Sequence, residues 1–103
     1  MNNQIITKES INSKLNSIIC YALRLNPENI KPESRIFKDL KAESLDILDI
    51  RFSIEQEFGV KIADNEFKET IGNGLNSTEF IEKFTVEGVA DFIESKLKTQ
   101  TVI

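Results

Sequence analysis

One serine in this chain has surroundings that suit phosphate chemistry. Ser44 stands where a loop ends and an amphipathic helix begins, within the run Leu40-Lys41-Ala42-Glu43-Ser44-Leu45-Asp46-Ile47-Leu48-Asp49. The first backbone N–H groups of a helix have no intrahelical acceptor, and the positive end of the helix dipole lies beside them. A phosphate group is therefore favoured next to this hydroxyl. On helix-boundary grounds alone, the plainer interpretation of Ser44 is a helix N-cap.

Other chemistry has little support, because the chain lacks the residue types that it needs. There is no histidine, the commonest general base and metal ligand, and Cys20 is the one cysteine. We interpret Cys20 as a packing residue or surface thiol, since no histidine could activate it. The sequence also lacks zinc-finger, EF-hand and nucleotide-binding glycine motifs. We therefore expect no catalytic residue and no metal site.

Length and composition are those of a small globular domain. A chain of 103 residues can bury one core, so we expect a single domain over residues 1–103. It is 40% hydrophobic and 29% charged, which argues against disorder. The N-terminus lacks the features of a signal peptide, and no stretch approaches about 18 apolar residues. We expect a cytoplasmic monomer without membrane insertion.

The net charge of −4 is unevenly distributed. Residues 1–42 contain seven basic and four acidic side chains, whereas residues 43–103 contain six basic and thirteen acidic ones. The acidic second part disfavours nucleic acid as a partner and favours a protein with a basic docking patch. Simple solubility is the alternative explanation, and charge alone does not separate the two.

The spacing of apolar residues predicts helices throughout. A first helix is expected to end at Pro27, and its apolar stripe consists of Ile11, Leu15, Ile18, Ala22 and Leu25. A last helix should begin after Thr85 as N-cap, with Val86, Val89, Ile93 and Leu97 on one face. Short helices are expected at about 64–71 and 77–84, and frayed ends at 1–6 and 98–103. The fold class is all-α: a helical bundle of three main helices with one or two short ones.

The central helix is expected from about Ser44 to Phe58, with Gly59 as its left-handed stop. It carries two apolar stripes. The first, which should face the core, consists of Ile47, Ile50, Ile54 and Phe58. The second consists of Leu45, Leu48 and Phe52. Together they are wider than one core contact requires, so the second stripe is either exposed for a partner or buried between neighbouring elements.

The residues around Ser44 resemble the signature of acyl carrier proteins. The similar runs are Asp39-Leu40, Glu43-Ser44-Leu45-Asp46, Ile54-Glu55-Gln56-Glu57-Phe58-Gly59-Val60-Lys61-Ile62 and Thr85-Val86. The resemblance covers about residues 11–97 and implies an acyl-carrier-like bundle. It also implies that Ser44 carries phosphopantetheine, whose thiol holds an acyl group as a thioester. The chain would then be a carrier for fatty-acid, lipid A or related acyl-chain biosynthesis, and not itself an enzyme.

The same resemblance implies a surface for docking to partner enzymes. Its residues are Glu43, Leu45, Asp46, Leu48, Asp49, Phe52 and Glu57. The implied partners are a phosphopantetheinyl transferase and the acyl-chain-synthesising and acyltransferase enzymes, each with a basic docking patch. Two residues depart from the family pattern. Glu43 replaces the usual aspartate and reaches further, and Arg51 interrupts the acidic helix, which is expected to exclude some partners.

The segment that follows the central helix resembles an insertion in specialised carriers that deliver very long acyl chains to lipid A. Those carriers commonly have tryptophan where Phe67 stands. The added apolar residues either enlarge an acyl pocket or extend the core; they are Phe67, Ile71, Leu75, Phe80, Ile81 and Phe84. Two alternatives remain open at this point. One is a carrier of a polyketide-type pathway, and the other is a helical interaction module that binds partners without modification.

Overall fold

The computed structural model describes residues 7–63, 66 and 77–101. These residues form four α-helices and one 3-10 turn: α1 (Lys8–Leu23), η1 (Pro27–Asn29), α2 (Ser44–Phe58), α3 (Ser77–Lys83) and α4 (Val86–Thr101). Within the described ranges, β structure is limited to an isolated bridge between Arg35 and Thr85. The predicted all-α fold class is confirmed.

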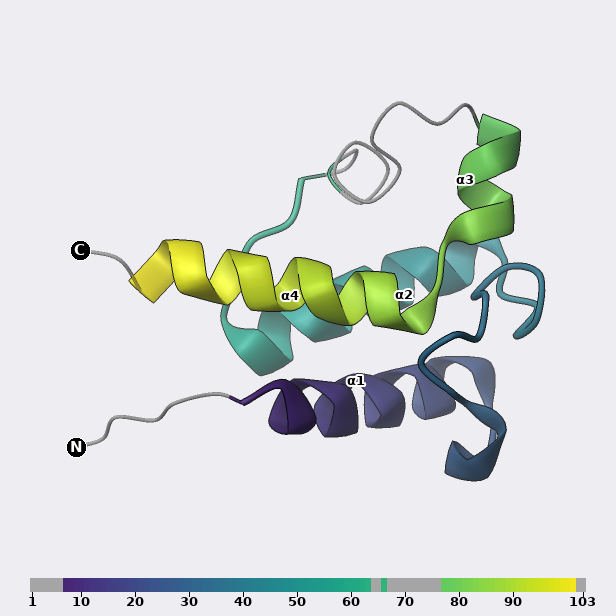
Figure 1. Cartoon of the computed structure of the whole chain (residues 1–103), viewed down its shortest axis with the longest axis horizontal. Helices are drawn as coiled ribbons and strands as arrows, with labels where there is room; N and C mark the ends of the chain where they lie inside the picture. Colours follow the sequence, from purple (N-terminus) through teal and green to yellow (C-terminus); the bar gives the residue numbers. More distant parts are fainter. Residues whose placement is uncertain (1–6, 64–65, 67–76, 102–103) are drawn as a thin grey trace.

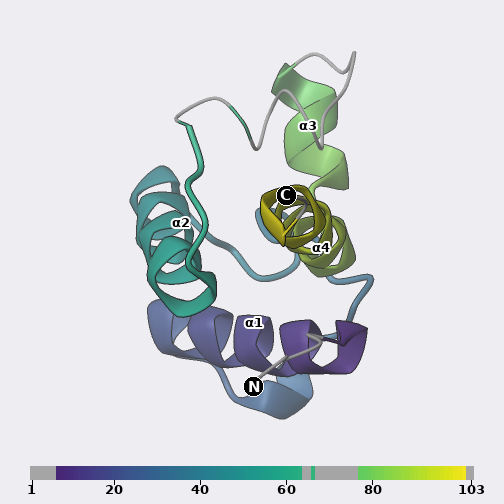
Figure 2. The same ribbon diagram turned by 90° about the vertical axis from the view of Figure 1, so that its left-hand side faces the viewer.

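Of the three long helices, α1 packs against both α2 and α4, and α3 stands at the start of α4 (Figure 1). Figure 2 shows α1 crossing beneath both α2 and α4, in agreement with the contacts of α1 with each of them. The long loop between α1 and α2 runs past the start of α4 before it enters α2. No helix in the described part of the chain is long and apolar enough to cross a membrane.

The core lies between the three long helices, and each buried residue among those that the structure describes is apolar. In α1 the fully buried residues are Ile11, Leu15 and Ile19. The predicted stripe placed Ile18 in the core instead of Ile19, but Ile18 is only partly buried. Both assignments fit a helical repeat of three and four, and the position of α1 between two neighbours selects Ile19.

The end of α1 differs from the prediction. The helix begins with Thr7 as N-cap, whose hydroxyl accepts a hydrogen bond from the Ser10 N–H at 3.1 Å. It ends at Leu23, before the predicted break at Pro27, because Arg24 adopts a left-handed conformation with φ 58°. The Arg24 N–H donates to the Cys20 carbonyl and closes the last turn.

The predicted bounds of the central helix agree with α2. The helix ends at Phe58, and the next residue, Gly59, is its C-cap, whose φ of +69° lies in the left-handed region that glycine enters at little cost. The start of α4 was also predicted correctly, since the Thr85 hydroxyl accepts a hydrogen bond from the Gly88 N–H at 3.0 Å. The helix continues to Thr101, however, through the part of the tail that was expected to be frayed from residue 98 onward.

Several predictions concern residues outside the described ranges. These are the short helix at 64–71, apart from Glu66, and the frayed ends at 1–6 and 102–103. Phe67, Ile71 and Leu75 of the insertion also lie outside the described residues. Of its other apolar residues, Phe84 is buried in the core, and Ile81 is 42% exposed.

Candidate functional site

The loop before α2 is fixed to the start of α4 by backbone hydrogen bonds. The Ile36 N–H donates to the Phe84 carbonyl at 2.8 Å, and the Val86 N–H donates to the Ser34 carbonyl at 3.0 Å. The buried side chains of Ile30, Ile36, Leu40 and Ala42 hold the same loop on the core. The backbone that leads into Ser44 is therefore held by the fold.

Aromatic packing and an ion pair connect this loop to α3. The ring of Phe37 lies edge-on to Phe80, with 6.4 Å between centroids, and Phe80 stacks on Phe84 with 4.8 Å between centroids. Lys38 lies 3.1 Å from the Glu82 carboxylate on the surface nearby. Of the described apolar residues of the predicted insertion, Phe84 therefore belongs to the core and Phe80 packs against it. The alternative role, lining an acyl pocket, stays a prediction.

The charged residues Arg35 and Asp39 stabilise the turn of this loop. Asp39 accepts hydrogen bonds from the Arg35 backbone N–H at 2.8 Å and from the guanidinium at 3.1 Å. The guanidinium, followed by the backbone N–H, holds the pKa of Asp39 below its ordinary value of 3.8. The hydrogen bond with the Asp39 carboxylate in turn raises the pKa of Arg35. Two of the charges near Ser44 thus have a structural role.

Helix α2 begins at Ser44 and not after it. Glu43 is the N-cap residue, with extended backbone angles, and its carbonyl accepts the N–H of Ile47 at 3.1 Å. The Glu43 N–H in turn donates to Asp46 Oδ2 at 2.8 Å. The interpretation of Ser44 as the N-cap is therefore wrong, because Glu43 and Asp46 cap the helix between them.

This arrangement leaves the Ser44 side chain accessible. Ser44 is exposed, and its hydroxyl takes part in no hydrogen bond with any residue that the structure describes. It projects from the first turn of a 15-residue helix, where backbone N–H groups and the helix dipole favour a phosphate. The residues present thus fit a phosphate ester on Ser44 Oγ.

The second apolar stripe of α2 is exposed. Leu45, Leu48 and Phe52 are 75%, 43% and 52% exposed, whereas Ile50, Ile54 and Phe58 are buried. Ile47, at the edge of the core stripe, is partly buried. Asp49 is exposed and lies one helical turn from Leu45. The alternative that neighbouring elements cover this stripe is therefore wrong for the part of the chain described.

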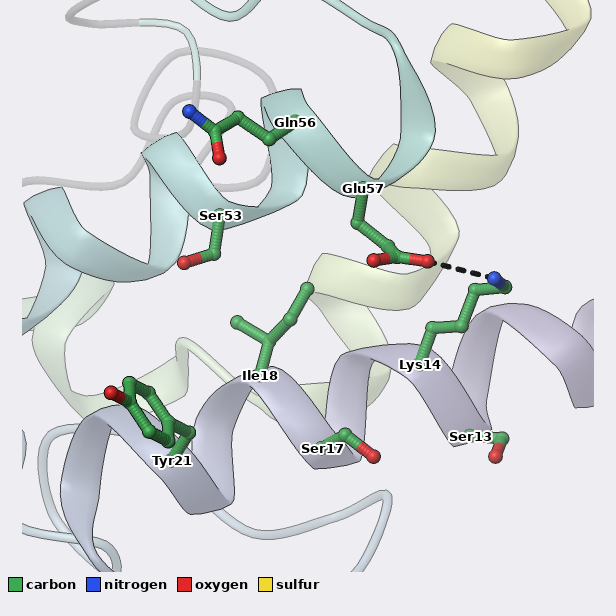
Figure 3. Close-up of a pocket in the computed structure, with 8 residues that line it drawn as sticks. All are labelled: Ser13, Lys14, Ser17, Ile18, Tyr21, Ser53, Gln56 and Glu57. Carbon is green, nitrogen blue, oxygen red and sulfur yellow. Dashed lines mark hydrogen bonds and ion pairs between the residues drawn. The ribbon is translucent and has the colours of Figure 1, made fainter.

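Glu57 lies apart from this exposed stripe. It is at the end of α2 that faces α1, where its carboxylate accepts a hydrogen bond from Lys14 Nζ at 2.8 Å (Figure 3). The two residues border a groove of about 670 Å³ between α1 and α2. Tyr21, which is 89% exposed, lies at the other end of the groove. The structure thus brings Leu45, Leu48, Asp49 and Phe52 together on the outer face of α2 and separates Glu57 from them.

The sequence did not predict that Arg51 and Glu55 bind the backbone of the segment after α2. Arg51 Nη1 donates to the Ile62 carbonyl at 2.7 Å, and the Ile62 N–H donates to Glu55 Oε2 at 2.7 Å. The spacing of Arg51 and Glu55 places both on one side of the helix, but nothing in it indicates Ile62 as their target. No cluster of three metal-binding side chains occurs among the described residues.

Comparison with known proteins agrees with this geometry. Residues 13–73 match the family described as "Phosphopantetheine attachment site". The chain is 42% identical to acyl carrier protein AcpXL of Rhizobium meliloti over 66 residues, which are 64% of this chain and 70% of that protein. It is 33% identical to an acyl carrier protein of Thermosynechococcus vestitus over 93 residues, 89% of this chain and 98% of the relative.

A second AcpXL, from Mesorhizobium japonicum, is 31% identical over 88 residues, 85% of this chain and 92% of the relative. Membership of a phosphopantetheine-bearing family favours a carrier over an interaction module that binds without modification. The match includes the start of α2 and most of the described core. This chain therefore belongs to the acyl carrier protein family and carries an acyl intermediate on covalently attached phosphopantetheine.

Proposed function

We propose that Ser44 is the residue to which phosphopantetheine is attached. The observation that carries this proposal is the exposed hydroxyl of Ser44 at the first turn of α2, within the family match. Ser53, on the same helix, lies in the groove between α1 and α2 and has no helix start beside it. Ser44 therefore has the better surroundings for a phosphate.

The charges around Ser44 affect how a phosphate is accommodated there. Glu43 and Asp46 are negative and oppose a phosphate, although one Asp46 oxygen already accepts the Glu43 N–H. A divalent cation or a basic patch of the transferase would screen this repulsion during loading. When attached, phosphopantetheine supplies a flexible arm with a terminal thiol that holds an acyl chain as a thioester. The chain itself would perform no bond chemistry. By presenting the tethered acyl group, it would raise the effective concentration of substrate at each enzyme.

The outer face of α2 is the proposed docking surface for partner enzymes. It combines the exposed apolar side chains of Leu45, Leu48 and Phe52 with the exposed carboxylate of Asp49. Such a face fits an apolar patch with a basic rim, on a phosphopantetheinyl transferase or an acyl-transferring enzyme. Glu43 and Asp46 lie at its Ser44 end, whereas Glu57, paired with Lys14, would contribute only at its edge.

The pathway and setting are also proposed. The likeness to two AcpXL proteins supports a specialised carrier over a general fatty-acid carrier. By the resemblance of its insertion, the chain would deliver a very long acyl chain to lipid A. We further propose that residues 1–103 act as one monomeric carrier domain in the cytoplasm.

Intact-mass measurement tests the attachment site directly. The chain is co-expressed with a phosphopantetheinyl transferase, as wild type, as Ser44→Ala and as the matched control Ser53→Ala. We expect wild type and Ser53→Ala to gain the mass of one phosphopantetheine and Ser44→Ala to gain none. Equal gain by Ser44→Ala would assign the group to another residue, and no gain by wild type would contradict the proposed function.

A further inference from the structure

Arg51 connects the proposed docking face to the segment that follows α2. We infer that Arg51 is a positioning residue, which holds the Phe52 ring in one orientation as the aromatic anchor for partner enzymes. This inference rests on the proposed docking role of α2. Arg51 is the one basic residue of α2, and its neighbours along the helix are mainly acidic and apolar.

The position of the Arg51 side chain is fixed at its far end. Its Nη1 donates to the Ile62 carbonyl at 2.7 Å, and the Ile62 N–H is held by Glu55 at 2.7 Å. The Ile62 side chain is buried in the core. Both backbone polar groups of Ile62 are thus bound by side chains one turn apart on α2. Figure 2 shows the chain after α2 turning back along this helix, where the two contacts hold it.

The same guanidinium group also contacts the aromatic ring of Phe52. The Arg51 Cζ atom lies 5.0 Å from the Phe52 ring centroid, within the range of a cation–π contact. A guanidinium is planar, so it can donate to a carbonyl from its edge and pack on a ring with its face. A lysine ammonium lacks this geometry. The buried Ile62 therefore anchors, through Arg51, a ring that is itself 52% exposed.

An aromatic side chain that is already oriented is an effective binding anchor. Ordering a side chain on association costs free energy, and prior ordering removes part of that cost. Phe52 keeps half of its surface accessible while one side of the ring contacts Arg51. The partner that fits has an apolar pocket for this ring.

Kinetics of phosphopantetheine transfer to the apo protein provide the first test. The probe is a broad-specificity phosphopantetheinyl transferase with coenzyme A, and the carrier concentration is varied. We expect Arg51→Met to raise KM for the carrier about fivefold with little change in kcat, because docking is weakened and not the chemistry. Arg51→Lys should behave like Arg51→Met, since retained charge does not restore both contacts. Lys61→Met, which removes the same charge from an exposed neighbouring position, is the matched control and should leave KM unchanged.

A double-mutant cycle separates positioning from direct contact. In a Phe52→Leu background, adding Arg51→Met should raise KM no further, because the ring that Arg51 positions is gone. An undiminished effect in that background, or full rescue by Arg51→Lys, would overturn the inference while leaving the carrier function intact. Failure of wild type to accept the group would overturn both.

Nuclear magnetic resonance gives a readout that does not depend on loading. In the apo protein, we expect nuclear Overhauser contacts between the Arg51 side chain and the Phe52 ring, and their loss in Arg51→Met. Their absence from wild type would contradict the inference. Circular dichroism of each variant confirms that the helices are retained, and Arg51→Lys provides a second variant if Arg51→Met is poorly folded.

Discussion

At the residue scale, the side chains around Ser44 divide into those that hold the backbone and those that remain exposed. Arg35 and Asp39 bind each other and shape the preceding loop. Glu43 and Asp46 form the start of the helix through the Glu43 N–H. The hydroxyl of Ser44 is left accessible by this arrangement, because other residues satisfy the backbone at the loop–helix junction.

The Arg35–Asp39 pair predicts a pH dependence of stability. The pKa of Asp39 is lower in the folded chain than its ordinary value of 3.8, so the unfolded chain binds protons more readily. The contribution of Asp39 is therefore present above pH 3.8 and is lost as the pH falls through the lowered pKa. Asp39→Asn should lower the thermal midpoint at neutral pH, and its difference from wild type should shrink on acidification.

Thermal unfolding followed by circular dichroism over a pH series measures this difference. Glu33→Gln is the matched control, because Glu33 is an exposed carboxylate of the same loop without a hydrogen bond among the described residues. A deficit of Asp39→Asn that stays constant down to the most acidic pH would contradict the assigned role of the pair.

At the element scale, α2 has two apolar faces with different roles. Ile50 and Ile54 are buried against the other helices, whereas Leu45 and Phe52 are mostly exposed. Exposed leucine and phenylalanine contribute little to folding, so their presence on one helix face is explained better by binding. The same helix thus supports both the core and the proposed docking surface.

Two substitutions on α2 should separate these roles. Ile54, which is fully buried, loses core contacts in Ile54→Ala, and the free energy of unfolding should fall by about 2–5 kcal/mol. Leu45→Ala should change it by less than about 0.5 kcal/mol but should raise the transferase KM about fivefold. Urea unfolding and loading kinetics measure the two effects. Comparable losses of stability in both variants would show that the exposed face also supports the fold.

At the scale of the whole molecule, ion pairs connect α1 to both of its neighbours. Lys14 pairs with Glu57 of α2, and Lys8 contacts Asp91 of α4. Lys96 of α4 also binds Glu66 at 2.7 Å, and this contact lowers the pKa of Glu66. These basic side chains neutralise acids away from the outer face of α2. Asp49, one of the acidic residues in 43–103, lies on the exposed face of α2 near Ser44.

This charge distribution predicts that loading depends on salt. Attraction between an acidic carrier and a basic enzyme patch is screened as the Debye length shortens, from about 10 Å at 0.1 M salt to about 3 Å at 1 M. Between about 0.05 M and 0.5 M NaCl, kcat/KM for the transferase should fall severalfold, mainly through KM. Stopped-flow or steady-state loading measures the change, with Asp49→Asn as a variant expected to be less sensitive. Salt-independent loading would exclude electrostatic steering.

The sequence by itself determined the helical fold and the position of Ser44 at the start of α2. These features depend on local physics: apolar spacing, a polar helix start, and Gly59 at a position with positive φ. The family signature is equally local, since most of it lies between Asp39 and Ile62. Local rules were also ambiguous in places, as the choice between Ile18 and Ile19 for the core illustrates.

Only the tertiary structure decided which surfaces are free and which charges are engaged. The exposure of Leu45 and Phe52 depends on where the other helices lie, and helical spacing carries no information about that. The pairing of Glu57 with Lys14, and the reach of Arg51 to Ile62, join residues that are 43 and 11 positions apart. Such contacts form only when packing brings separate segments together. Which charged side chains of α2 are engaged, and which remain on the proposed docking face, therefore cannot be predicted from local sequence patterns.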